Sequence, residues 1–336
     1  MATILPLHAD FRQNTSDHKI TPIDPVPAIW IYASTINTIT QIGVWAMTNL
    51  TDMDEGRIIA HENVLPEKIE RIIAHRNSGG KPSSPVLLTY RPDAELDQLI
   101  QQICLDENSA YLHRTEPTFS LWRIGDPELI DRIQMAFRTI KAVYVADGHH
   151  RLAAAHKMQQ QHERLISSLY VPSDQLRISA FHRLLRMNNL VDHAVFMDQI
   201  SEYFVVRPLK SEKPYRPDRP NRIGLYFQGC WYRLDLKDNA RKEGRPDASS
   251  LQELILAPLL GIADPASDER LENFPDPAFD EMVSALQAGE GLVGFTLYPI
   301  TVSEFLVAAD SQEMLPPKST WIEPKIPRKL LIQAGI

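Results

Sequence analysis

Five residues with reactive or conformationally special side chains follow one another near the middle of the chain. They are Asp147, Gly148, His149, His150 and Arg151, which supply a carboxylate, a flexible backbone position, two imidazoles and a guanidinium. A carboxylate can bind a metal ion or accept a proton, and a guanidinium binds phosphate or carboxylate through parallel hydrogen bonds. This combination indicates an anion-binding or catalytic site.

The residues on either side predict where these five side chains lie. An apolar run, Val143 to Val145, is typical of a buried strand, and a helical pattern begins directly after Arg151. A helix that begins at a strand end presents unpaired N–H groups and the positive end of its dipole, so anions bind there readily. The alternative is an ordinary Asp-Gly turn followed by two partly exposed histidines.

A second pair, His61 and Glu62, stands shortly before a predicted helix. Pro66 suits the first turn of that helix, and Ile69, Ile72 and Ile73 share one of its faces. A histidine beside a carboxylate can be catalytic, but such a pair more often caps a helix or lies in solvent.

Two polar groups in the C-terminal half are further candidates. His182 and Arg183 lie in an amphipathic stretch, where they either reach the same pocket or pack as ordinary side chains. Near the end of the chain, Lys318, Ser319 and Thr320 offer a cation and two hydroxyls between prolines. They form either an ordered phosphate-binding loop or a solvated tail.

Strand and helix patterns alternate between residues 85 and 165, which predicts an α/β fold with mixed sheets and helices packed on them. We expect an irregular arm over residues 1–27, an α/β domain with both motifs over residues 28–185, and an α+β subdomain over residues 186–336 that closes over the site. Ser250 and Glu253 have the spacing of a capping box, and a hairpin turn is expected at Gln228 and Gly229.

Composition narrows the range of functions. The chain has 336 residues, a net charge of -8 and 43% hydrophobic residues, as a globular protein has. This charge argues against general binding to nucleic acid or to anionic membranes. The two cysteines, Cys104 and Cys230, form no metal-binding or disulfide pattern, and no apolar run approaches the length of a membrane span. We expect a cytoplasmic protein acting on a small molecule, with the oligomeric state open.

Two common catalytic motifs do not occur. The chain contains no GxxxxGK[ST], which excludes a P-loop enzyme, and no GxSxG, which argues against a hydrolase with a Ser/His/Asp triad.

Several stretches in fixed order resemble the domain-of-unknown-function family 1015. The matching text is GRIIAHENV with Glu67, Lys68 and Arg71 downstream, then LWRIGDPELI, VYVADGHHRLAAA, the segment around His182 and Arg183, LQELILAPLLGI and MLPPKSTWIEPK. The chain departs from the family pattern between His8 and Ala28, where the proline-tyrosine-aspartate-valine motif is missing and the segment is shorter. Whatever that segment supplies to the family is in doubt here.

The Asp-Gly-His-His-Arg motif with its upstream His-Glu is also similar to that of the free serine kinases of the ParB/sulfiredoxin-like superfamily. This resemblance implies a ParB/sulfiredoxin-like core and transfer of a phosphoryl group, with Glu62 as the base. It implies that Asp147 lies near the hydroxyl or a Mg²⁺ ion and that Gly148, His149, His150 and Arg151 lie on the phosphates. The resemblance covers only the middle of the chain. From the residue types we group His150 with the catalytic residues and expect further phosphate or nucleotide contacts at Lys318, Ser319 and Thr320. Possible substrate contacts are His61, His182 and Arg183.

Three functional hypotheses follow. The first is a small-molecule phosphotransferase that uses ATP, ADP or pyrophosphate and a hydroxylated acceptor such as serine, because positioning and charge neutralisation are most of what phosphoryl transfer requires. The second is a regulatory protein that binds a nucleotide or phosphorylated metabolite without turnover. The third, nucleic-acid binding or cleavage, is disfavoured by the acidic composition.

Overall fold

The computed structural model of the chain describes residues 2–7, 9–12, 26–36, 39–80, 84–105, 112–115, 118–158, 164–187, 192–210, 213–242, 244–289, 291–323 and 331–334. The chain divides into two units. Unit 1 is Met1–Arg177 together with Pro324–Ile336, and unit 2 is Ile178–Glu323. The sequence-based boundary at 185/186 therefore differs from the observed division, and the C-terminal end returns to unit 1.

The boundary is displaced because one apolar stretch contains two strands. Residues 177–185 have a continuous strand pattern, but the structure breaks it at Ala180 into β11 (Arg177–Ser179) and β12 (Phe181–Arg186). β12 lies in the sheet of unit 2, whereas β11 pairs with β18 (Trp321–Glu323). Hydrophobic periodicity reports burial and does not show which core a strand enters.

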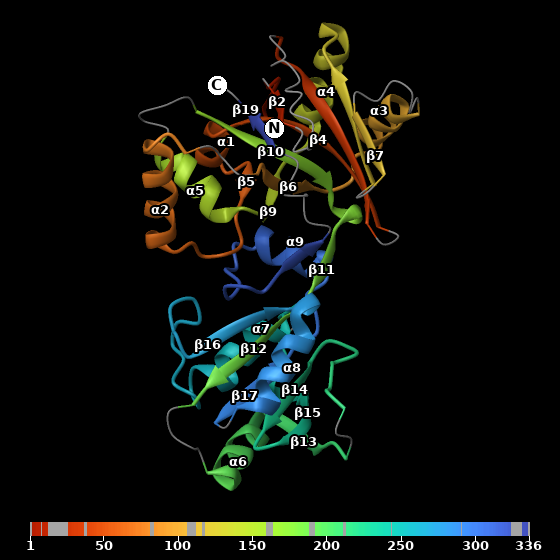
Figure 1. Ribbon diagram of the computed structural model, residues 1–336. Coiled ribbons are helices and arrows are strands. Elements are labelled where there is room, and N and C mark those ends of the chain that lie inside the picture. The colour runs from red at the N-terminus through yellow and green to blue at the C-terminus, as the bar shows by residue number, and fades with distance from the viewer. Residues whose placement is uncertain are drawn as a thin grey trace. The chain divides into compact units, whose positions relative to one another are not determined.

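The described part of unit 1 is built on a nine-stranded mixed sheet (Figure 1). Its order is β5-β9-β6-β10-β4-β3-β8-β7, with β1 beside β4. β10 is parallel to β6 and β5 is parallel to β9, while the remaining pairs are antiparallel. The strands are β1 (Ile4–Leu5), β3 (Ile29–Ile36), β4 (Ile39–Asn49), β5 (Ile58–Ile59), β6 (Val86–Tyr90), β7 (Leu112–Thr115), β8 (Thr118–Ile124), β9 (Val143–Asp147) and β10 (Leu165–Pro172).

Two helices of unit 1 begin where the sequence places a capping aspartate. Asp93 accepts a hydrogen bond from the N–H of Leu96 at 3.0 Å, and Asp126 accepts one from Leu129 at 3.0 Å. The helices are α1 (Thr51–Asp54), α2 (Pro66–Asn77), α3 (Ala94–Cys104), α4 (Pro127–Thr139) and α5 (His149–Met158), followed by the 3₁₀ turn η2 (Ser173–Gln175). α2 packs beside α5 (Figure 1).

The N-terminal residues are more regular than an arm. β1 pairs with β4, Leu7 bridges to Ala28, and the N–H of Thr3 donates to Asp52 at 2.6 Å. The expectation of an irregular segment is therefore wrong for residues 2–7. Their strand pairing is too short to give a recognisable pattern among the polar and proline-rich residues of this region. β2 (Ala9–Arg12) pairs with β19 (Leu331–Ala334), and residues 13–25 lie outside the described residues.

Unit 2 contains a six-stranded sheet among its described residues, in the order β13-β15-β14-β17-β12-β16. Its strands, besides β12, are β13 (Phe204–Pro208), β14 (Arg222–Phe227), β15 (Cys230–Leu236), β16 (Leu271–Pro275) and β17 (Leu292–Thr296). The predicted hairpin between β14 and β15 is confirmed. Both turn residues, Gln228 (φ 47°) and Gly229 (φ 80°), have the positive φ that a two-residue hairpin turn requires.

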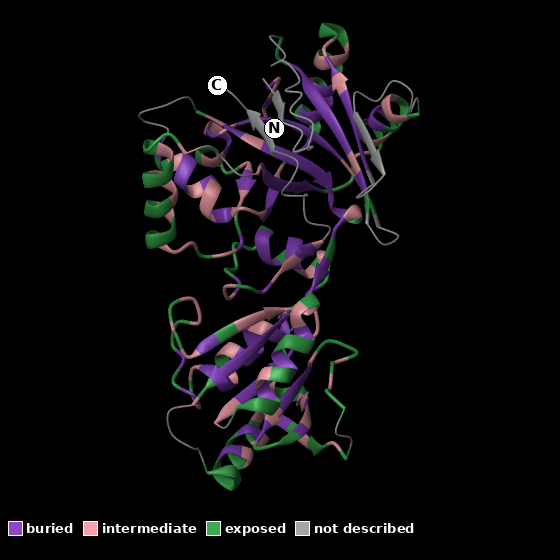
Figure 2. Cartoon of the chain, viewed as in Figure 1, coloured by how far each residue is buried: buried purple, intermediate pink, exposed green. Residues whose placement is uncertain are grey.

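The two faces of the unit 2 sheet have separate hydrophobic cores. Leu185 packs into the cluster formed with α6 and α7, whereas its neighbour Leu184 packs against α8, because successive strand residues point to opposite faces. Buried residues accordingly lie along the central strands of each unit (Figure 2). The helices are α6 (His193–Tyr203), α7 (Asp247–Leu251), α8 (Phe279–Ala288) and α9 (Val302–Asp310), with the 3₁₀ turns η3 (Asp238–Ala240) and η5 (Asp276–Ala278). The mixed α/β fold class expected from the sequence is confirmed.

The predicted capping box at Ser250 and Glu253 is wrong. Ser250 is buried inside α7, which begins at Asp247 after Pro246 and continues as the π-helical turn η4 (Gln252–Leu256). The described helix that does carry a capping box is α9, where Thr301 and Glu304 exchange both hydrogen bonds. Pro246 directly before Asp247 indicated the start of this helix better than the spacing of Ser250 and Glu253 did.

Asp247 is a buried carboxylate whose ionisation opposes folding. Its side chain accepts the N–H of Asn221 at 2.8 Å, yet burial raises its pKa from 3.8 to about 7, and Glu304 adds to this effect. The backbone N–H groups of Asn221, Arg222 and Tyr298 oppose the shift. Because the folded-state pKa is above the unfolded one, this residue stabilises the fold at low pH and loses that contribution as the pH rises to about 7.

We predict that Asp247→Asn removes this pH dependence. Between pH 4 and pH 8, the free energy of unfolding of the variant should gain about 2–4 kcal/mol relative to the unsubstituted protein, since one pKa unit is about 1.4 kcal/mol. Urea denaturation at the two pH values measures the difference. Asp238→Asn, at an exposed position of unit 2, is the matched control. An equal effect of Asp247→Asn at both pH values would contradict the prediction.

Candidate functional site

The strand–turn–helix joint predicted around Asp147 is present in unit 1. β9 ends at Asp147, Gly148 has φ 100°, and α5 begins at His149. The Gly148 carbonyl accepts the N–H of Leu152 at 3.0 Å, so Gly148 is the residue from which the helix starts. A bulge in the pairing of β9 with β6 precedes the turn, because Leu87 pairs with Asp147 while Leu88 pairs with Val145. Such a bulge redirects the side chains at the end of a strand.

Arg151 and Asp147 form an ion pair at this joint. Nη2 of Arg151 donates to Oδ2 of Asp147 at 2.8 Å. Nη1 donates to the carbonyls of Ser84 and Pro85, each at 2.7 Å, and to the Ser84 hydroxyl. Burial lowers the pKa of Arg151, and the charge of Asp147 opposes this shift. The guanidinium therefore connects the end of β9 to the segment that leads into β6.

The absence of a side chain at Gly148 leaves room for the guanidinium of Arg151. A Cβ atom at residue 148 would lie 2.8 Å from Nη2 and 3.0 Å from Nε of that guanidinium. From the sequence we expected Gly148 to admit a ligand to the backbone. The structure shows that the space beside its Cα is adjacent to the arginine, so glycine is needed here both for its positive φ and for this contact.

His61 and His149 meet in a buried pair. Nδ1 of His61 and Nε2 of His149 are 3.2 Å apart, and the rings pack edge to face with centroids 4.5 Å apart. Burial holds the pKa of His61 well below its usual value, His149 lowers it further, and the backbone of Val145 opposes the shift. His61 is therefore neutral at neutral pH, and one proton lies between the two rings.

His150 supports the start of α2. Its Nε2 accepts the backbone N–H of Leu65, the residue before α2, at 3.1 Å. An accepting nitrogen carries no proton, so the ring is held in the tautomer protonated at Nδ1. This contact gives His150 a structural role, and the catalytic role predicted for it stays a prediction.

Glu62 lies in the segment between β5 and α2. It is partly buried and directly follows His61, which brings this segment to His149 and thus to the joint. The structure therefore brings the backbone of the His61–Glu62 motif to the Asp147–Arg151 motif, an arrangement that the resemblance to the free serine kinases implies. That the Glu62 carboxylate acts as a base stays a prediction.

Asp147 is the one candidate metal ligand named from the sequence. Among the residues that the structure describes, no three histidine, cysteine or acidic side chains are grouped so as to hold a metal ion. Mg²⁺ often binds proteins through one or two carboxylates and completes its shell with water and substrate phosphates. The half-exposed carboxylate of Asp147 fits such a minimal contribution.

Sequence reasoning missed Arg76, a partly buried arginine in the last turn of α2. Burial lowers its pKa, and the positive charge of Arg151 lowers it further. Helical spacing contained the signal, because Arg76 lies three and four residues after Ile73 and Ile72 and so shares their face. A second positive charge therefore lies within electrostatic range of Arg151.

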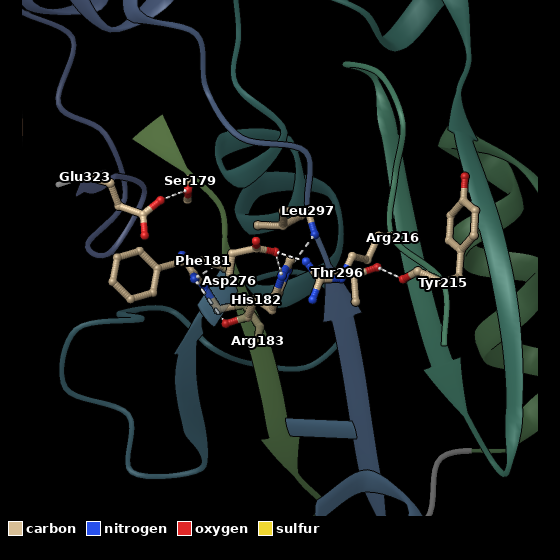
Figure 3. A network of polar contacts seen from close by, with 10 residues as sticks. All are labelled: Ser179, Phe181, His182, Arg183, Tyr215, Arg216, Asp276, Thr296, Leu297 and Glu323. Atoms are coloured by element: carbon tan, nitrogen blue, oxygen red, sulfur yellow. Dashed lines mark hydrogen bonds and ion pairs between the residues drawn. The ribbon is translucent and has the colours of Figure 1, made fainter. Parts of the chain in front are cut away.

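His182 is the centre of a polar network in unit 2 (Figure 3). The ring is 1% exposed, Nδ1 accepts the N–H of Leu297 at 3.2 Å, and Nε2 donates to Oδ1 of Asp276 at 3.1 Å. Burial lowers the pKa of His182, and the hydrogen bond with Asp276 opposes this shift. Both ring nitrogens are thus occupied within unit 2, which favours the packed role over a substrate contact.

Arg216 and Asp276 were not recognised from the sequence. Nη1 of Arg216 donates to Oδ1 of Asp276 at 2.6 Å (Figure 3). Its guanidinium lies 3.9 Å from the ring centroid of Phe279. The hydrogen bond from His182 lowers the pKa of Asp276, and Arg216 lowers it further. These residues are separated by about 60 positions or more in the chain, so local patterns contain no signal for them.

The loop with Lys318, Ser319 and Thr320 is ordered. Arg183 donates to the carbonyls of Pro317 and Lys318, and the Ser319 hydroxyl donates to the carbonyl of Pro316 at 2.6 Å. Thr320 is partly buried and Lys318 is exposed. The interpretation of this text as a solvated tail is therefore wrong, and an anion-binding role for the loop stays a prediction.

The candidate residues thus form two groups. His61, Glu62, Asp147, Gly148, His149, His150 and Arg151 belong to unit 1, whereas His182, Arg183, Lys318, Ser319 and Thr320 belong to unit 2. The expectation that residues 186–336 close over the first group stays a prediction. No helix in the described ranges is long and apolar enough to span a membrane.

Residues 9–257 match the sequence profile of a family described as "Protein of unknown function (DUF1015)". The chain belongs to this family. The match confirms the resemblance in the motif regions of unit 1, while the Lys318–Thr320 loop of this DUF1015 protein lies beyond the matched residues. No protein with a curated description matches the sequence.

The DUF1015 chain is similar to several solved structures at low identity. A free serine kinase mutant in complex with ADP has a TM-score of 0.47 and 14% identity, covering 83% of this chain and 87% of the other. A conserved hypothetical protein from Pyrococcus furiosus has a TM-score of 0.45 and 12% identity, covering 84% and 91%. SbnI from Staphylococcus aureus, with a C-terminal truncation, has a TM-score of 0.45 and 10% identity, covering 83% and 82%.

We predict that His150→Ala loosens the start of α2. Removal of the acceptor leaves the N–H of Leu65 without its hydrogen bond, which costs about 1 kcal/mol of stability. Hydrogen exchange at the Leu65 amide should become faster, and His150→Gln should restore part of the protection because its carbonyl can accept. His75→Ala, an exposed position on the same helix, is the control. Unchanged exchange at Leu65 in His150→Ala would contradict the proposed contact.

Proposed function

We propose that this protein is a small-molecule phosphotransferase that moves a phosphoryl group from ATP, ADP or pyrophosphate to a hydroxyl of a small metabolite such as serine. The observation that carries the proposal is the joint at Asp147–Arg151, where a carboxylate and a guanidinium are fixed to each other at the start of α5. The similarity between the sequence of this motif and that of the free serine kinases supports phosphoryl transfer as the reaction and a small hydroxylated metabolite as the acceptor.

The phosphate donor binds at the N-terminus of α5. The first N–H groups of this ten-residue helix and its positive dipole end favour an anion, and Arg151 and Arg76 add two positive charges. Both arginines are partly desolvated, which strengthens their attraction to phosphate oxygens. Gly148 and His149 complete the backbone of this cradle.

Glu62 acts as the base on the acceptor. The hydroxyl oxygen forms a bond to the terminal phosphorus of the donor while the bridging P–O bond to the remaining phosphate breaks, and the hydroxyl proton passes to the Glu62 carboxylate. Mg²⁺ would neutralise charge on the donor phosphates when bound, with Asp147 as its protein ligand. His61 is neutral and buried, so in this proposal it positions His149 and the Glu62 segment.

The Lys318–Thr320 loop is proposed as a second anion-binding element, within unit 2. Its lysine is exposed, and its backbone is fixed through Pro316, Pro317 and Lys318 carbonyls. An exposed ammonium on an ordered backbone binds an oxyanion with less entropy loss than one on a disordered segment.

One observation favours the second candidate, a protein that binds a nucleotide or phosphometabolite without turnover. Both terminal nitrogens of Arg151 already donate to protein acceptors, namely Asp147, Ser84 and Pro85. A guanidinium engaged in this way contributes charge and rigidity rather than a transition-state contact, which suits binding more than catalysis.

We predict that the protein phosphorylates a small hydroxylated acceptor in the presence of Mg²⁺. Phosphorus NMR and mass spectrometry would follow ATP, ADP or pyrophosphate together with L-serine, L-threonine, homoserine or glycerol. Glu62→Gln should lower the transfer rate by about 10²–10⁴-fold, the usual contribution of a general base, and leave donor affinity within about twofold. Glu67→Gln, an exposed glutamate at the start of α2, is the matched control.

The outcomes separate the two candidates. Donor binding that Arg151→Lys weakens, with no transfer to any acceptor and no effect of Glu62→Gln, would replace the phosphotransferase by the binding protein. Absence of both transfer and donor binding would overturn both candidates.

A further inference from the structure

Arg183 is a buried arginine that donates hydrogen bonds to four backbone carbonyls. The residue is 2% exposed. Nη1 donates to the carbonyls of Phe181 at 3.2 Å and His182 at 3.5 Å, and Nη2 donates to those of Pro317 at 3.2 Å and Lys318 at 3.1 Å. The guanidinium therefore joins β12 to a loop about 135 residues later in the chain. Figure 3 shows it with Phe181, to whose carbonyl it donates.

This arrangement depends on the shape of arginine. A guanidinium stays charged when buried and directs its donors in a planar fork, so it can bind two pairs of carbonyls on different segments. A lysine at the same position would have one nitrogen and could not reach both pairs in the same geometry. Because these donors are engaged by the protein's own loop, the geometry favours a packed role for Arg183 over the substrate contact predicted from the sequence.

The loop held by Arg183 has a backbone conformation that needs support. Lys318 has φ 61°, in the left-handed region that non-glycine residues adopt at a cost. The Ser319 hydroxyl closes the turn on the carbonyl of Pro316. Arg183 binds the carbonyl of Lys318 itself, so the strained residue is the one that the guanidinium holds.

The side chain of Lys318 is directed by the same strand. Its Nζ lies 5.6 Å from the ring centroid of Phe181, and that ring packs edge to face on Trp321 at 5.5 Å. Within the described residues no carboxylate pairs with Lys318. The Lys318 ammonium is exposed, its backbone is fixed, and it is directed over an aromatic ring. Because no described carboxylate of the protein pairs with it, this ammonium is suited to bind an oxyanion from outside the protein.

We propose that Arg183 is a positioning residue that holds Lys318 for an oxyanion of the substrates, either a phosphate or a carboxylate. The proposal rests on the phosphotransferase or binding function above, because it assigns a residue that acts on the loop of that function. Arg183 itself contacts no ligand. It fixes the carbonyl of Lys318 and so sets the direction of the ammonium.

The first test measures the loop without any ligand. Arg183→Lys should raise hydrogen exchange at the amides of Lys318, Ser319 and Thr320 at least tenfold and leave the amides of β14 and β17 unchanged. Arg222→Lys is the matched control, since Arg222 is a buried arginine of unit 2 that pairs with Asp218 and Asp235 and does not contact the loop. Equal exchange of the loop in Arg183→Lys and the unsubstituted protein would overturn the positioning role.

The second test asks whether Arg183 acts through Lys318. Calorimetric titrations with inorganic pyrophosphate and with L-serine distinguish the phosphate from the carboxylate as the anion. Lys318→Asn removes the charge and keeps a residue that tolerates the left-handed conformation. Each single substitution should weaken binding of one probe about tenfold, and the double substitution should weaken it no more than twofold beyond either one, because the two residues form one unit.

Three results would overturn the inference in distinguishable ways. A double substitution that weakens binding about a hundredfold would show that Arg183 acts independently of Lys318. Pyrophosphate binding that Arg151→Lys reduces, with neither probe affected by Arg183→Lys, would leave the proposed function standing without this residue. If neither probe binds the unsubstituted protein, the oxyanion role fails together with the proposed function, and the exchange measurement alone then decides whether Arg183 holds the loop.

Discussion

The structure depends on a simple constraint: a buried arginine keeps its charge and must be given acceptors. In both units a guanidinium meets this requirement by binding main-chain carbonyls of a segment distant in sequence. Arg151 binds the carbonyls of Ser84 and Pro85, and Arg183 binds those of Pro317 and Lys318. A guanidinium offers five donors, so each arginine can bind a segment that is distant from it in the sequence. The two motifs that first suggest ligand binding are thus also the points that fix the backbone around them.

Local signals predicted much of the fold because many elements follow local rules. Aspartate caps fixed the starts of α3 and α4, and a two-residue turn fixed the β14–β15 hairpin. The failures occurred where distant packing decided the outcome. The apolar stretch at residues 177–185 divides between two sheets, and Ser250 looked like a cap although α7 begins three residues earlier. Neither difference leaves a trace in hydrophobic periodicity, which reports burial but not the partner.

In the candidate site, too, local features were predicted from the sequence and contacts between distant residues were not. Residue types and spacing predicted the joint at Asp147–Arg151, since a strand end that leads into a helix is a local feature, whereas its proximity to His61 was implied only by the resemblance to the free serine kinases. The partners of those side chains could not be predicted. His150 accepts from Leu65 across 85 positions, and Asp276 meets His182 across 94. Arg76 was the exception, because its helical spacing from Ile72 and Ile73 predicts that it lies on their face of the helix.

The contact between Gly148 and Arg151 has a consequence for how this protein can vary. A side chain at residue 148 would occupy the space of the guanidinium three positions later, and the ion pair with Asp147 would be displaced with it. A side chain at residue 148 is therefore tolerated only if the guanidinium moves or Arg151 changes in step. Any descendant or engineered form that lacks this glycine must hold the segment before β6 by other means.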